Sequence, residues 1–187
     1  NNGEISESRL DDGCRRILTV KENRGILDWI ESNFSLNKAL STVGSATNRA
    51  TEREITAAAV TVVKNENNTL PLVVKENQKI LMICTYDNER AQMIMGYNRA
   101  KEAGLIPEFA EVKVVRYNGS NMDTVKENID WADTVFVNSE ISAASRFSSN
   151  HWLYSNVEDI VDYTHEKGKK SIVMSVDKPY DVQMYAN

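Results

Sequence analysis

Carboxylates dominate the side chains of this 187-residue chain that can do chemistry, with 27 Asp and Glu against two His and two Cys. Their number alone assigns no role, because acid and base catalysis needs carboxyl groups held at a fixed separation. Glu140 is the carboxylate we nominate, because it follows an apolar run and begins a polar stretch. A strand-end loop at this point could reach a neighbouring domain, whereas a solvated loop glutamate is the simpler interpretation.

The two histidines lie in different settings. His151 precedes Trp152, and this pair offers the aromatic face and polar edge that carbohydrate recognition uses, so both residues could line the wall of a substrate cleft. The plainer interpretation of His151 is a loop residue that packs on the domain surface. His165 precedes Gly168 in the last turn of a predicted helix, where the helix dipole favours it.

Other chemistries lack their signatures. The turn from Thr85 to Asn88 has no glycine for a dinucleotide, and Asp87 or Asn88 is more simply a helix cap. A phosphorelay receiver would need an aspartate where Asn138 stands. No G-x-S-x-G elbow is present. No cofactor is predicted, and because the cysteines and histidines lack a zinc spacing, no metal is predicted either. Cys14 and Cys84 are predicted to be buried free thiols.

The elements that must position these residues alternate along the second half of the chain. Apolar runs predict strands at 79–85, 112–117, 134–138 and 170–176, and the intervening stretches predict helices at 88–103, 122–128 and 153–166. Strands that are apolar throughout are typical of a sheet buried on both faces. We therefore predict an α/β fold, a three-layer α/β/α sandwich with a mainly parallel sheet, preceded by a helical linker segment. Residues 139–150 are predicted to be a loop at the carboxyl edge.

The first half of the chain predicts helices and a linker. Ser6 or Ser8 can cap a helix that ends at Gly25, and the stretch that follows is a linker with short helical pieces. Thr51 and Glu54 have the spacing of a capping box, and they predict the start of a helix whose apolar stripe reaches Val63.

Composition excludes several classes of protein. The net charge of -5 argues against nucleic acid and anionic membrane surfaces as partners, because phosphate binding needs clustered Lys and Arg. No apolar run approaches the roughly 20 residues of a membrane span. The first residue is not Met and the opening residues are polar, so we expect an internal piece of a longer protein, whose localisation the sequence leaves open.

Three stretches, in a consistent order, resemble parts of one known family. Residues 59–72, AVTVVKNENNTLPL, are similar to the phrase where that family's second domain begins. Residues 6–21, SESRLDDGCRRILTVK, resemble the last helix of its catalytic barrel, and residues 175–187, SVDKPYDVQMYAN, resemble a strand and turn with a Pro-Tyr-Asp core. The family is glycoside hydrolase family 3, and the last stretch resembles its β-N-acetylglucosaminidase branch.

The resemblance implies a division of the chain and a role for it. Residues 1–25 would be the last helix of a truncated barrel, 26–50 a linker and 51–187 the C-terminal α/β sandwich domain. The chain alone would be inactive, because the missing N-terminal barrel carries the catalytic motifs and carbohydrate binds at the interdomain cleft. A chain separated from its barrel would expose apolar surface and could self-associate.

Two alternatives stay open. In the glucosidase branch of the family the second domain lends an acid/base glutamate to the barrel, and Glu140 is the candidate for that role. A free-standing module is the other alternative, and it would bind a small ligand with the loops after Thr85, Tyr117 and Asn138.

Overall fold

A computed structural model describes residues 3–28, 30, 34–143, 146, 148 and 151–185. The chain divides into two compact units, Asn1–Thr61 and Val62–Asn187.

A serine caps the start of each helix described in the first unit. The first unit contains α1 (Glu7–Asn23), α2 (Leu36–Thr42) and α3 (Ala46–Ala59). Ser6, Ser35 and Ser45 each accept a hydrogen bond from the backbone N–H three residues ahead, which satisfies an unpaired donor of the first turn. None of the three helices contains a buried residue.

Two predictions for this unit are wrong in detail. Thr51 does not start a helix, because Ser45 caps α3 six residues earlier and the Thr51 hydroxyl donates to the Thr47 carbonyl inside the helix. α3 ends at Ala59, so Val62 and Val63 lie outside the helix to which the apolar stripe assigned them. The predicted divisions at residues 25 and 50 stay predictions.

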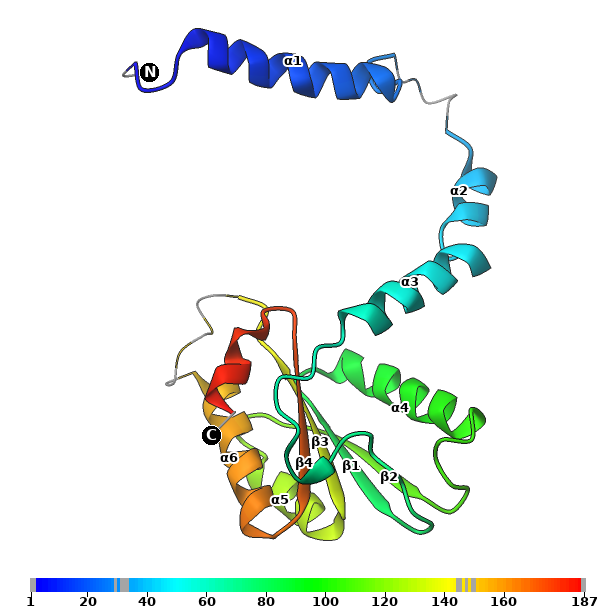
Figure 1. The fold of residues 1–187 in the computed structure, drawn as a ribbon, viewed down its shortest axis with the longest axis vertical. Coiled ribbons are helices and arrows are strands. Elements are labelled where there is room, and N and C mark those ends of the chain that lie inside the picture. The colour runs from blue at the N-terminus through cyan, green and yellow to red at the C-terminus, as the bar shows by residue number, and fades with distance from the viewer. Residues whose placement is uncertain are drawn as a thin grey trace. The chain divides into compact units, whose positions relative to one another are not determined.

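Four parallel strands form the sheet of the second unit. They are β1 (Lys79–Cys84), β2 (Glu111–Arg116), β3 (Thr134–Glu140) and β4 (Lys170–Val176), in the order β2-β1-β3-β4. Between them run α4 (Asp87–Glu102), α5 (Met122–Trp131) and α6 (Trp152–Glu166), and short 3₁₀ segments lie at Glu66–Asn68 and Pro179–Met184. Figure 1 shows α4 on one side of the sheet and α5 and α6 on the other. The prediction of a three-layer α/β/α sandwich is confirmed.

The core lies between the sheet and the helices α5 and α6. Alternate residues of the two central strands point into it, because successive side chains of a strand face opposite sides. Its buried members are Leu81, Ile83, Tyr117, Val125, Ile129, Ala132, Val135, Val137, Leu153, Val157, Ile160 and Val161. The strand residues of this core therefore come from two of the predicted apolar runs, those of β1 and β3.

The loop predicted at residues 139–150 begins later than expected. Ser139 and Glu140 still belong to β3, where they pair with Ser175 and Val176 of β4. Polar residues can end this strand because the Ser139 hydroxyl donates to a buried carboxylate, that of Asp181. Positions 144, 145, 147, 149 and 150 lie outside the described residues.

The two cysteines differ from each other. Both are free, as predicted, and Cys84 is buried in β1. Burial and the nearby Glu89 carboxylate raise the pKa of the Cys84 thiol to about 11. Cys14, also predicted to be buried, is instead exposed on α1, a helix in which none of the described side chains is buried.

Candidate functional site

Glu140 ends β3 at the carboxyl edge of the sheet, where a hydrogen bond joins its carboxyl group to that of Glu89. Glu89 belongs to the first turn of α4 and is only 5% exposed. A hydrogen bond between two carboxyl groups requires a proton on one of them. The structure thus pairs the single glutamate nominated from the sequence with a second, buried one, and we call Glu89 and Glu140 the carboxyl pair.

Three N–H groups hold the Glu89 carboxyl group in place. One Glu89 carboxylate oxygen accepts hydrogen bonds from the backbone N–H groups of Thr85, at 2.8 Å, and Tyr86, at 3.0 Å. The other oxygen accepts from the Asn138 side-chain amide at 2.9 Å. These three hydrogen bonds fix the position of the Glu89 carboxyl group beside Glu140.

The acidity of Glu140 follows from this pairing. The hydrogen bond to Glu89, burial, and the negative charges of Glu89 and Asp177 raise the pKa of Glu140 to about 7. A carboxyl group with this pKa can donate or accept a proton near neutral pH, which is the requirement for a general acid or base. The pair also lies where β1 and β3 end side by side, the point at which strand order reverses and parallel α/β sheets commonly bind ligands.

Buried hydroxyl groups form hydrogen bonds next to the carboxyl pair. The Thr85 hydroxyl donates to the Asn138 carbonyl at 3.1 Å and shares a 3.2 Å hydrogen bond with the Tyr117 hydroxyl. Tyr117 is fully buried, and burial raises the pKa of its phenol. These contacts hold the ends of β1 and β3 in a fixed relation, because each buried polar group has a partner.

Asp181 connects the ends of β3 and β4. Its carboxylate is fully buried and accepts hydrogen bonds from the hydroxyl groups of Ser139 on β3 and Ser175 on β4. The Tyr185 hydroxyl lies 3.4 Å from that of Ser139. Asp181 is the aspartate of the Pro-Tyr-Asp core singled out in the sequence. In the structure it links β3 to β4 through the hydrogen bonds from Ser139 and Ser175, and we call it the clasp between the two strands.

His151 and Trp152 lie at the start of α6. His151 is the N-cap residue, and its Nδ1 accepts a 3.3 Å hydrogen bond from the Leu153 N–H. The His151 and Trp152 rings stack with centroids 5.9 Å apart, and the Trp152 ring meets the Tyr117 ring edge-on at 6.0 Å. Trp152 is 37% exposed, so part of its ring faces solvent. Its neighbour Tyr117 forms the hydrogen bond to Thr85 described above.

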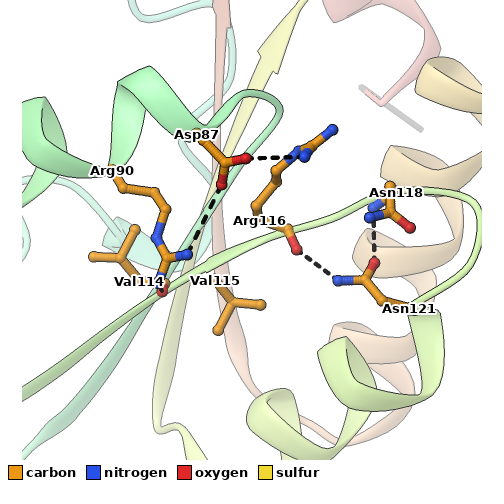
Figure 2. Close-up of a pocket in the computed structure, with 7 residues that line it drawn as sticks. All are labelled: Asp87, Arg90, Val114, Val115, Arg116, Asn118 and Asn121. Atoms are coloured by element: carbon orange, nitrogen blue, oxygen red, sulfur yellow. Dashed lines mark hydrogen bonds and ion pairs between the residues drawn. The ribbon is translucent and has the colours of Figure 1, made fainter.

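A pocket of about 290 Å³ opens beside α4, at the adjacent ends of β1 and β2 (Figure 2). We call it the arginine pocket, and its lining residues are Asp87, Arg90, Val114, Val115, Arg116, Asn118 and Asn121. Asp87, predicted as a helix cap, is the first residue of α4, and its carboxylate pairs with Arg116 at 3.0 Å. Glu89 takes the capping role instead through the Tyr86 N–H.

Sequence reasoning missed Glu89, Arg90 and Arg116. The signal for Glu89 was its position three residues after the N-cap, the spacing of a capping box, but Tyr86 stands where Ser or Thr would mark the cap. Nothing in the sequence pairs Arg90 with Arg116, because they meet only when β2 lies beside β1.

Among the described residues, no three His, Cys, Asp or Glu side chains gather closely enough to hold a metal ion. In that same part of the chain, no helix has the length and apolar character needed to cross a bilayer.

Comparison with known proteins gives one informative result. No family model matches the sequence. A protein of Cellulomonas fimi named Beta-N-acetylglucosaminidase/beta-glucosidase is 28% identical to this chain over 112 residues, which are 60% of the chain and 19% of that protein. The matched part thus spans about a fifth of the relative's length. The match points to glycoside hydrolase family 3, and because the relative's name joins two activities, it does not separate the branches of that family.

Proposed function

We propose that this chain is the C-terminal α/β domain of a glycoside hydrolase family 3 enzyme, with a helical segment in front of it, and that it is noncatalytic. The observation that carries the proposal is the match to the Cellulomonas fimi protein, whose name states glycosidase activities. The parallel three-layer sandwich agrees with the domain that the sequence resemblance implies. The parent enzyme would hydrolyse O-glycosidic bonds with residues of a barrel that precedes this chain.

The exposed face of α1 supports a docking role for the first unit. Leu10, Ile17 and Leu18 recur at helical spacing and are 48%, 59% and 51% exposed. An apolar stripe on a helix normally packs against a neighbour, and in the parent enzyme the barrel would cover it.

We assign the parent to the β-N-acetylglucosaminidase-like branch, because the chain carries that branch's Pro-Tyr-Asp core and buries its aspartate, Asp181, between two strands. Trp152 and His151 would form part of the wall of the carbohydrate cleft shared with the barrel. The exposed part of the Trp152 ring offers the apolar face on which a sugar ring can stack.

Hydrolysis assays test the noncatalytic role. The chain alone, at high concentration, should not cleave chromogenic N-acetylglucosaminide or glucoside substrates, whereas the full-length Cellulomonas fimi protein serves as the positive control. Adding a separately produced barrel of the parent should restore or raise activity if this domain shapes the cleft. Turnover by the chain alone that a single carboxylate substitution abolishes would overturn the proposal.

A second candidate function is favoured by the carboxyl pair. Glu140, with its pKa of about 7, has the acidity of a general acid, and it lies at an edge of the sheet from which a domain can lend a residue to its neighbour. In this version the domain would be of the glucosidase type and Glu140 would protonate the leaving group.

The two candidates differ in the response of the full-length parent to one change. If Glu140 is the acid, Glu140→Ala lowers kcat and azide restores turnover by replacing the missing acid/base chemistry. Glu127→Ala, which removes an exposed carboxylate of α5 outside the pair, is the matched control and should leave turnover unchanged. Full activity of Glu140→Ala would rule out the lent acid and leave the noncatalytic role.

A further inference from the structure

The arginine pocket has a local positive charge that the proposed function does not use. Asp87 stands between two guanidinium groups, with its carboxylate oxygens 3.0 Å from Arg116 Nη1 and 3.8 Å from Arg90 Nη1. The lining of the pocket contains one carboxylate and two guanidinium groups, so it has more positive than negative side chains. The net charge of the chain is -5, so the charge of this site is opposite in sign to that of the whole chain.

Hydrogen bonds to the backbone hold both guanidinium groups in place. Arg116 Nε donates to the Thr85 carbonyl at 3.3 Å, and Arg90 Nη2 donates to the Val114 carbonyl, also at 3.3 Å. A guanidinium group has five N–H donors, so donors remain on each after these bonds and the contacts to Asp87. Figure 2 shows one terminal nitrogen of Arg116 directed away from Asp87. Ordered guanidinium groups with spare donors match the geometry of a carboxylate or phosphate.

Two asparagines, Asn118 and Asn121, add polar groups to the lining of the pocket. The Asn121 side chain accepts from the Asn118 N–H at 2.7 Å and donates to the Arg116 carbonyl at 2.8 Å, which ties the loop after β2 to the strand (Figure 2). The pocket also lies where α4 begins, so the positive end of that helix dipole adds to the charge of the arginines.

We propose that the arginine pocket binds a small oxyanion group, the phosphate or carboxylate of a ligand no larger than an acidic monosaccharide. Its volume of about 290 Å³ lies at the lower end of the range for small-molecule sites. Arg116 and Arg90 would bind the anion, and Asp87 would weaken binding by its own negative charge. The site belongs to this chain alone and does not depend on the parent being a glycosidase.

Titration calorimetry on the full chain tests this site. The probes are inorganic phosphate, glucose 6-phosphate and glucuronate, with neutral glucose as the blank. We expect saturable binding of at least one anion, weakened by added salt, and no binding of glucose. The tightest of the three probes identifies the source of the oxyanion: free phosphate, a sugar phosphate or a sugar carboxylate. Absence of saturable binding of all three overturns the proposal.

Substitutions of opposite sign locate the site. Arg116→Gln should weaken binding about tenfold, the loss expected for one charge-assisted hydrogen bond. Asp87→Asn should strengthen binding, by about fivefold, because it removes a negative charge close to the anion. Arg99→Gln, on the last turn of α4 and outside the pocket lining, is the control for net charge and should change nothing.

The Asp87→Asn result keeps the test decisive if Arg116→Gln unfolds the chain. Binding that is unchanged or weakened in Asp87→Asn, with the fold intact by circular dichroism, would show that the anion binds elsewhere. Equal effects of Arg99→Gln and Arg116→Gln would show nonspecific attraction and also overturn the site.

Discussion

At the scale of single residues, the proton on Glu140 makes the stability of the folded chain depend on pH. The folded chain holds this proton up to a pKa of about 7, whereas the unfolded chain releases it near the ordinary value of 4.5. Between these two values the folded state binds more protons than the unfolded state, so the stability that the pair contributes is present at low pH and is lost as pH rises through 7.

Glu140→Gln should remove this pH dependence. The glutamine amide can donate to the Glu89 carboxylate at every pH, so the variant should exceed the unmodified chain in stability at pH 8, by on the order of 1 kcal/mol after allowing for partial solvent exposure. Urea denaturation from pH 5 to 8 measures the effect. Glu127→Gln, on the exposed face of α5, is the control. A variant with the same loss of stability between pH 5 and 8 as the unmodified chain would contradict the pairing.

Asp181 makes a second prediction at this scale. Asp181→Ala leaves the Ser139 and Ser175 hydroxyl groups without their acceptor, and we expect it to destabilise the chain by about 2–4 kcal/mol. Tyr180→Ala, at the neighbouring position with a side chain 67% exposed, should change stability by less than about 1 kcal/mol. Thermal or urea denaturation compares the two. Similar losses from both variants would show that Asp181 is not the clasp between the strands.

At the scale of elements, the C-terminus of α5 depends on one lysine. The last carbonyl groups of a helix lack intrahelical donors, and Lys169 Nζ donates to three carbonyls, those of Ile129, Asp130 and Ala132, at 2.8, 2.6 and 2.6 Å. The ammonium group also complements the negative end of the helix dipole. Lys169, which follows the end of α6, therefore stabilises the end of a different helix, α5.

Lys169→Met keeps the length of the side chain but removes its donors, and it should destabilise the chain by about 1–3 kcal/mol. Lys170→Met, at the exposed first residue of β4, changes net charge equally and should have less than about half this effect. Urea denaturation measures both variants, and hydrogen exchange of the last turn of α5 should accelerate only in Lys169→Met. Equal destabilisation by both changes would mean that charge, and not capping, is responsible.

Element boundaries were predictable where local chemistry decides them. The helix ends at Gly25, Gly104 and Gly168 follow from the positive φ angles of +65°, +73° and +65° that these glycines adopt. β3 was predicted too short, since its last two residues are polar and gain their partners from β4 and Asp181, which no local pattern records. Thr51 was misread because Ser45 offers a cap earlier in the same helix.

At the scale of the whole molecule, the apolar stripe on α1 predicts association. This chain by itself should form dimers or larger species at micromolar concentration, because no other side chain in its described part buries Leu10, Ile17 and Leu18. Ile17→Glu places a charge in the stripe and should shift the chain toward monomer in size-exclusion chromatography with light scattering. Thr19→Glu adds the same charge on the opposite side of the helix and should not. A uniform monomer of the unmodified chain would contradict this expectation.

By itself, the sequence determined which segments of this protein are strands and helices, because apolar runs, caps and glycines act over a few residues. It also carried the resemblance to glycoside hydrolase family 3 in short continuous phrases. Only the tertiary structure decided which polar residues meet. Glu89 and Glu140 are 51 positions apart, and Arg90, Arg116 and Asp181 find their partners on other elements. These pairings depend on the strand order β2-β1-β3-β4, a property of the packed sheet that no local pattern encodes.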